Sequence, residues 1–123
     1  MVAVVEDDSS FRRALSRSLT IRGFRTYDYD SAEEFLRRHP SEPSDCIVLD
    51  IHLGGMSGFE LQAELAARGG AQIPIVFITA FDDPATRRHA QDVGAAGYFQ
   101  KPFDDQSLVD TINRVARRPS RPV

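Results

Sequence analysis

The sequence predicts an α/β domain in which helices cover both faces of a parallel sheet. Three apolar runs, at residues 2–5, 46–49 and 75–78, are short, rich in β-branched residues and not alternating. This pattern is typical of strands that are covered on both faces. Helical patterns separate the runs, and an alternation of strands and helices requires right-handed crossovers in a parallel sheet. With 123 residues and 41% hydrophobic content, the chain is long enough for one core and too short for two ordinary domains.

The first half of the chain carries clear boundary signals. Phe11, Leu15 and Leu19 recur at fourfold spacing, and Gly23 stands at the position of a helix C-cap. Residues 24–29 alternate, which predicts an edge strand, and residues 96–99 form a weaker fifth candidate.

Further helix boundaries come from caps and breakers. Two serine–glutamate pairs read as capping boxes, in which the serine accepts from a first-turn amide and the glutamate returns the bond. They are Ser31 with Glu34, closed by Pro40, and Ser57 with Glu60, closed by Gly69-Gly70. Two later helices complete five βα repeats: one runs from Asp83-Pro84 to about Val93 with Gly94 after it, and one runs from Asp104 to Pro119. Residues 1–118 therefore form the predicted domain, and residues 119–123 read as a linker or C-terminal end.

Composition narrows the function classes. A formal net charge of −3 gives no overall attraction to nucleic acid or to an anionic membrane. Cys46 is the only cysteine, which excludes an internal disulfide and favours a reducing, cytoplasmic compartment. We expect neither an export signal nor a membrane anchor, because no apolar stretch approaches about 20 residues.

Polar side chains stand where the predicted strands end. The carboxyl ends of parallel strands meet at one edge of a sheet, so we expect these side chains to lie close together. They are Glu6, Asp7 and Asp8 after the first strand, Asp50 after the third, Thr79 at the end of the fourth, and Lys101 after the fifth.

Each of these residues also has a simpler interpretation. Glu6 and Asp7 would repel unless a cation lay between them, and oxygen ligands suit Mg²⁺; alternatively one acid caps the next helix and the others are solvated. Asp8 is the best candidate for capping alone. Asp50 by itself is more typical of a loop or cap, and Thr79 of an ordinary strand.

Lys101 is the only lysine in the chain, beside fourteen arginines. Its compact ammonium suits a carboxylate or a single phosphate oxygen. A solvated surface lysine is the simpler interpretation, but the joint placement of acids, hydroxyl and ammonium at strand ends favours a built site.

Over nearly its whole length the chain resembles the receiver domain of bacterial two-component response regulators. The matching segments include Glu6-Asp7-Asp8, Leu49-Asp50-Ile51, Met56-Ser57-Gly58, Ile78-Thr79-Ala80 and Lys101-Pro102-Phe103. The resemblance implies a flavodoxin-like (βα)5 three-layer sandwich with strand order 2-1-3-4-5.

The resemblance also implies a mechanism and a set of partners. Asp50 would accept a phosphoryl group from a sensor histidine kinase, as in a phosphorelay. Mg²⁺ would be held by Glu6, Asp7, Asp50 and the His52 backbone carbonyl, while Thr79 and Lys101 would contact phosphoryl oxygens. The family usually has a cis Lys-Pro bond here, so we expect one at Lys101-Pro102. Thr79 and Tyr98 would switch an interaction surface that a downstream effector domain or protein reads; a homodimer through the last two helices stays open.

Two departures from the family pattern stand near the site. Gly54, followed by Gly55, replaces a common proline, so we expect a more mobile loop beside Asp50. Glu6 stands where aspartate is also common, and we expect its longer side chain to be tolerated.

Three other functions would need different residues or would not need these. An aspartyl-phosphate phosphatase resembling haloacid dehalogenases would carry Asp-x-Asp after the first strand, and a nucleotide-binding module would carry a glycine-rich turn there. The chain has Asp8-Ser9-Ser10 instead. A pure interaction domain would not need Asp7, Asp50, Thr79 and Lys101 together.

Overall fold

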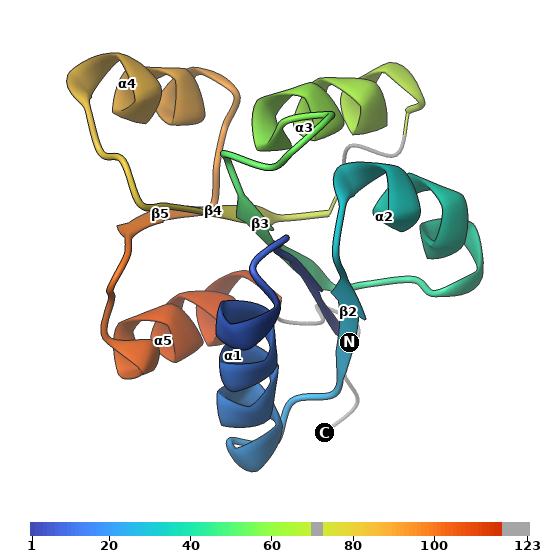
Figure 1. Cartoon of the computed structure of the whole chain (residues 1–123), viewed down its shortest axis with the longest axis vertical. Coiled ribbons are helices and arrows are strands. Elements are labelled where there is room, and N and C mark those ends of the chain that lie inside the picture. The colour runs from blue at the N-terminus through green and yellow to red at the C-terminus, as the bar shows by residue number, and fades with distance from the viewer. Residues whose placement is uncertain (70–72, 117–123) are drawn as a thin grey trace.

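Five parallel strands form one sheet in the order β2-β1-β3-β4-β5, which confirms the predicted topology (Figure 1). The computed structural model describes residues 1–69 and 73–116. Strands and helices alternate as the sequence predicts: β1 (Val2–Val5), α1 (Ser9–Ile21), β2 (Thr26–Tyr29), α2 (Ala32–Arg38), the short 3₁₀ helix η1 (His39–Ser41), β3 (Cys46–Asp50), α3 (Gly58–Ala67), β4 (Ile75–Thr79), α4 (Pro84–Asp92), β5 (Gly97–Gln100) and α5 (Asp105–Val115).

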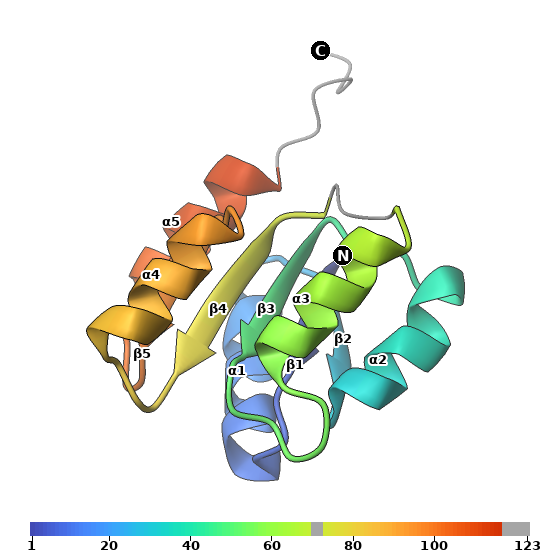
Figure 2. The same cartoon turned by 90° about the horizontal axis from the view of Figure 1, so that it is seen from above.

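Helices cover both faces of the sheet, with α2, α3 and α4 on one side and α1 and α5 on the other (Figure 1, Figure 2). Successive residues of a strand point to opposite faces. In β3, Ile47 and Leu49 pack with the α2–α4 layer, whereas Cys46 and Val48 pack with the α1–α5 layer. The central strands are buried on both faces, which explains why their apolar runs do not alternate.

The predicted helix caps are mostly confirmed. Asp8 caps α1 and accepts a hydrogen bond from the amide of Phe11. Ser57 and Glu60 form the complete capping box of α3. The predicted box at Ser31 is wrong in one half: Ser31 accepts from the Glu34 amide, but the Glu34 carboxylate pairs with Arg37 and Arg38. Two nearby guanidinium groups compete successfully for that carboxylate.

Several element boundaries also differ from prediction: Asp50 is the last residue of β3, and β5 is Gly97–Gln100 and not residues 96–99. The edge strand β2 begins at Thr26 because the Phe24 amide is still bonded to Leu19 of the preceding helix. Helix α2 ends at Arg38, before Pro40, which lies in η1. The predicted helix end at Pro119 and the predicted linker at residues 119–123 lie outside the described residues.

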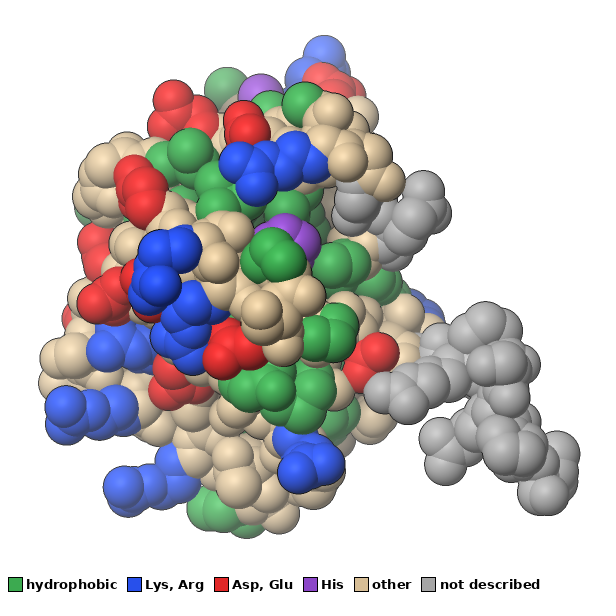
Figure 3. Space-filling model, turned by 90° about the vertical axis from the view of Figure 1, so that its right-hand side faces the viewer, with side chains coloured by type: hydrophobic (Ala, Val, Ile, Leu, Met, Phe, Trp, Pro, Cys, Tyr) green, Lys and Arg blue, Asp and Glu red, His purple; other side chains and the backbone are tan. Residues whose placement is uncertain are grey.

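Charged side chains of both signs interleave on the face that carries α2 (Figure 3). Arg38 pairs with Glu34 and Glu42, so opposite charges compensate along this helix. Among the described residues, every helix is too short or too polar to cross a lipid bilayer.

Candidate functional site

The register of the sheet brings the predicted acids together. In the parallel pairing of β1 with β3, Val5 lies opposite Leu49, so the next residues, Glu6 and Asp50, emerge side by side. In the pairing of β4 with β5, Thr79 lies opposite Gln100, and Lys101 follows at the same edge. The carboxyl edge of the sheet therefore gathers groups that are up to 95 residues apart in the sequence.

Lys101 joins two of the acids. Its ammonium nitrogen Nζ donates to Glu6 Oε1 at 2.6 Å and lies 3.5 Å from Asp50 Oδ2. Glu6 and Asp50 are almost fully buried, at 1% and 4% exposure, whereas Asp7 is exposed. The Lys101 side chain is only 17% exposed and is paired with acids, so it is not a solvated surface lysine in this structure.

Burial raises the pKa values of Glu6 and Asp50. It raises the pKa of Glu6 from 4.5 to about 7, an effect that the hydrogen bond from Lys101 opposes. Burial also raises the pKa of Asp50, against the attraction of Lys101 and the hydrogen bond from the His52 amide. Three carboxylates and one ammonium leave two negative charges uncompensated when all are ionised, which favours a divalent cation.

The donor set fits such a cation. Glu6, Asp7 and Asp50 each offer a carboxylate oxygen, and these three oxygens lie within 4.8 Å of one another. A hard ion such as Mg²⁺ prefers oxygen ligands and keeps several waters, so few protein donors suffice. The exposed side of the cluster, at Asp7, leaves room for those waters.

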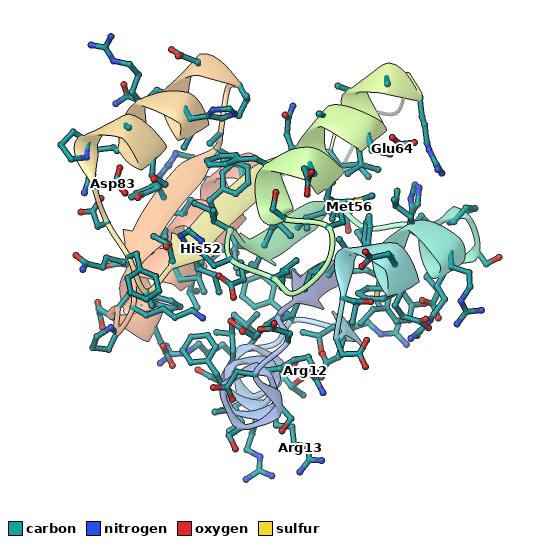
Figure 4. All side chains as sticks on the ribbon, turned by 45° about the horizontal axis from the view of Figure 1, so that its top comes forward. Arg12, Arg13, His52, Met56, Glu64 and Asp83 are labelled. Carbon is teal, nitrogen blue, oxygen red and sulfur yellow. The ribbon has the colours of Figure 1, made fainter. Side chains whose placement is uncertain are left out.

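The loop between β3 and α3 flanks this cluster. The His52 amide donates to Asp50 Oδ1 at 3.2 Å, and the Gly54 amide donates to Asp7 Oδ2 at 3.1 Å. The His52 side chain, labelled in Figure 4, lies beside the loop that precedes α4, where its ring meets Phe81 edge-on with the ring centres 5.4 Å apart. Metal binding by the His52 carbonyl stays a prediction.

Thr79 lies at the edge of the sheet with its hydroxyl engaged in a local turn. Its Oγ1 donates to the Phe81 carbonyl and accepts from the Phe81 amide, both at 3.0 Å. The Thr79 backbone carbonyl accepts from the Lys101 amide at 2.7 Å. Thr79 is thus tied to Lys101 through the backbone, while its hydroxyl is directed to the β4–α4 loop.

Aromatic side chains hold Lys101 in place. Its Nζ lies 4.4 Å from the centre of the Phe11 ring, which in turn packs edge-on against Phe103. A cation above an aromatic face is attracted by the ring quadrupole, so Phe11 supports the ammonium from α1. The Lys101-Pro102 peptide bond is cis, as the resemblance implied.

Tyr98, the predicted switch residue, is half-buried on β5 and bound to the loop before α4. Its hydroxyl donates to Asp82 Oδ1 at 3.0 Å, and the Arg87 guanidinium lies 4.9 Å from the ring centre. Arg87 also pairs with Asp82. The three side chains form one cluster that connects the β4–α4 loop, α4 and β5.

Sequence reasoning missed several contributors to this site. Phe11 read only as a helix-face residue, although a ring at the start of α1 faces the Lys101 ammonium. Asp82 carries no signal in the sequence that pairs it with Tyr98. Glu33, whose carboxylate accepts from the Met56 amide at 2.9 Å, was overlooked because the adjacent Glu34 fitted the capping-box spacing.

Comparisons with known proteins agree with this geometry. The family model of the response regulator receiver domain matches residues 2–113. Nodulation protein W of Bradyrhizobium diazoefficiens is 39% identical over 118 residues, which cover 96% of this chain and 52% of that protein. The structure of response regulator StyR superimposes with a TM-score of 0.83 at 42% identity, covering 94% of this chain and 58% of that chain. The structure of FixJ-N gives a TM-score of 0.85 at 32% identity, covering 94% and 91%.

The chain spans about half the length of the curated relatives it matches, such as 52% of the transcriptional regulatory protein FixJ of Azorhizobium caulinodans. The similarity therefore concerns one domain of those longer proteins.

Proposed function

Because this chain belongs to the receiver domains of two-component response regulators, we propose that Asp50 is its phosphoryl acceptor and that a sensor histidine kinase is the donor. The observation that supports this most strongly is the gathering of Glu6, Asp7, Asp50 and Lys101 at one sheet edge. The phosphatase and nucleotide-binding alternatives have no comparable support, since the first strand lacks their motifs.

In the proposed reaction an oxygen of Asp50 forms a bond to phosphorus while the bond from phosphorus to the kinase histidine breaks. Lys101, 3.5 Å from Asp50 Oδ2, is placed to neutralise oxygens of the incoming group. Glu6, Asp7, Asp50 and the His52 carbonyl would hold Mg²⁺, which would offset further negative charge on the transferring group. The catalysis in this proposal is limited to the phosphorylation and dephosphorylation of the domain itself.

The proposed output is a change of surface. Thr79 would exchange its bonds to Phe81 for one to the phosphoryl group, and this would move the loop that also carries Asp82. Because Asp82 holds the Tyr98 hydroxyl, that movement would release Tyr98 to turn inward. The affected surface comprises α4, β5 and α5, and a two-state equilibrium of this kind responds to any group that binds one state better.

The partners in this proposal are a histidine kinase and a downstream effector domain or protein. The domain itself would bind neither nucleic acid nor membrane, and it would act in the cytoplasm. The proposal is compatible with a homodimer as the active form.

The test is Mg²⁺-dependent labelling by acetyl phosphate, a small donor that needs no kinase. We expect wild-type protein to be labelled, Asp50→Asn to stay unlabelled, and EDTA to abolish labelling. Asp8→Asn is the matched control, since the Asp8 side chain caps α1, and the substitution keeps the backbone amide that donates to Glu6 Oε2. Equal labelling of the Asp50→Asn variant would show that another residue is the acceptor.

A further inference from the structure

The loop between β3 and α3 depends on two carboxylates outside it. It contains two consecutive glycines, and Gly55 has the left-handed backbone angle φ of +74°. Glycine pairs have unusually wide conformational freedom, so this loop needs external contacts to hold one shape. Asp7 accepts from the Gly54 amide at 3.1 Å, and Glu33 accepts from the Met56 amide at 2.9 Å.

Glu33 is well placed to hold the far end of the loop. It lies in the first turn of α2, and its carboxylate reaches the amide of Met56 near the end of the loop. Its Oε2 would lie only 2.8 Å from a Cβ atom built on Gly55, so the carboxylate rests directly against the glycine backbone. Its neighbour Glu34 pairs with Arg37 and Arg38, whereas Glu33 has no ion pair among the described residues.

A charged acceptor makes this contact stronger than an ordinary surface hydrogen bond. Hydrogen bonds to ionised groups are roughly twice as strong as those between neutral groups. The Met56 amide lowers the pKa of Glu33, so the carboxylate is fully ionised at neutral pH. The contact therefore persists under the conditions in which the domain would be phosphorylated.

We propose that Glu33 is a positioning residue for the acceptor site, holding the Gly54-Gly55 loop so that the Gly54 amide orients Asp7. This inference rests on the proposed function of Asp50. The Gly54 amide binds one oxygen of Asp7, and Asp7 offers a carboxylate oxygen within 4.8 Å of those of Glu6 and Asp50. The effect of Glu33 is thus transmitted through the loop and Asp7, and Glu33 itself touches neither the metal nor the phosphoryl group.

The inference predicts a specific kinetic signature. Loss of Glu33 loosens Asp7, so more Mg²⁺ is needed, but the chemical groups of the site are intact. Substitution of a residue that holds a metal ligand in place commonly weakens metal binding by 10- to 100-fold. Because Glu33 acts on Asp7 only through the loop, we expect a smaller effect, about a fivefold rise in the Mg²⁺ concentration for half-maximal labelling by acetyl phosphate. The labelling rate at saturating Mg²⁺ should change less than twofold.

Three variants separate positioning from charge. Glu33→Ala removes the acceptor, and Glu33→Gln keeps an acceptor oxygen without the charge. Glu64→Ala is the matched control, since it removes the same charge from α3 away from the loop (Figure 4). We expect Glu33→Gln to recover at least half of the loss, on a logarithmic scale, and Glu64→Ala to match wild type.

A second measurement follows the loop directly. Amide hydrogen exchange in the metal-free protein should become faster at Met56 and Gly54 in Glu33→Ala and should be unchanged in Glu64→Ala. An unchanged Mg²⁺ midpoint in Glu33→Ala overturns the inference, and so does an equal shift in Glu33→Gln and Glu33→Ala, which would reveal a pure charge effect. Wild-type protein and the Asp50→Asn variant measured alongside separate the two proposals. If wild type is labelled and Asp50→Asn is not, the role of Glu33 can fail while the acceptor assignment stands.

Discussion

Substitution of Gly58 by alanine should damage both the fold and the site. A Cβ atom at this position would lie 2.5 Å from the Asp50 carbonyl oxygen and 2.9 Å from the Ile51 Cα, and both are backbone atoms. Overpacking of this kind typically costs about 1–3 kcal/mol. Alanine is favoured over glycine inside helices by up to about 1 kcal/mol, but Gly58 is the first residue of α3, where this gain is smaller. We therefore expect a net loss of roughly 2 kcal/mol in the free energy of unfolding.

Gly54→Ala is the matched control for this prediction. A Cβ atom there would lie 3.8 Å from Asp7 Oδ2, an ordinary contact, and its backbone is not in the left-handed region. Restriction of the unfolded chain should make this variant at least as stable as wild type. Urea unfolding followed by circular dichroism measures both free energies, and acetyl phosphate labelling measures the displacement of Asp50. Wild-type stability and labelling in Gly58→Ala would refute the steric argument.

Two further predictions concern the half-buried Tyr98 hydroxyl and the buried Cys46 thiol. Tyr98→Phe removes the hydroxyl that donates to Asp82, and it should lower the free energy of unfolding in urea by about 1 kcal/mol. The control Tyr27→Phe loses no hydrogen bond to the described residues and should lower it by less. Equal losses in the two variants would contradict the assigned bond. Burial raises the pKa of the Cys46 thiol from 9 to about 12, so at pH 8 a thiol reagent should modify the protein only as fast as it unfolds. The folded thiol keeps its proton longer than the unfolded one, so this group's contribution to stability is lost as the pH rises from 9 toward 12. Rapid modification of native protein would show that Cys46 is accessible.

The sheet and its edge could be predicted because they depend on strong, short-range signals. Residues 46–49 form a short continuous apolar run of the length and composition typical of a strand covered on both faces, and Asp50 follows it directly. The alternation of strands and helices then determines that the carboxyl ends of the strands share one edge. The strand order, by contrast, came from the resemblance, since periodicity does not specify which strands are neighbours.

The contacts between side chains could not be predicted in the same way. Ser31 has the spacing of a capping box with Glu34, but spacing does not reveal that Arg37 and Arg38 would take that carboxylate. Glu33, one residue earlier, reaches a loop more than twenty residues away. Such choices depend on competition among partners that are close in space and distant in sequence, so local patterns carry no information about them.

The acid cluster has more negative than positive charge when all its groups are ionised. The fold buries Glu6 and Asp50 beside a single ammonium, and their raised pKa values record the cost of that burial. A fully compensated cluster would be more stable but would have no affinity left for a cation or a phosphoryl group. Ligands that bind only the folded state stabilise it in proportion to their affinity. If Mg²⁺ occupies the cluster as proposed, it would offset the charge of the buried acids, and occupancy of the site would then be linked to the stability of the sheet edge that holds it.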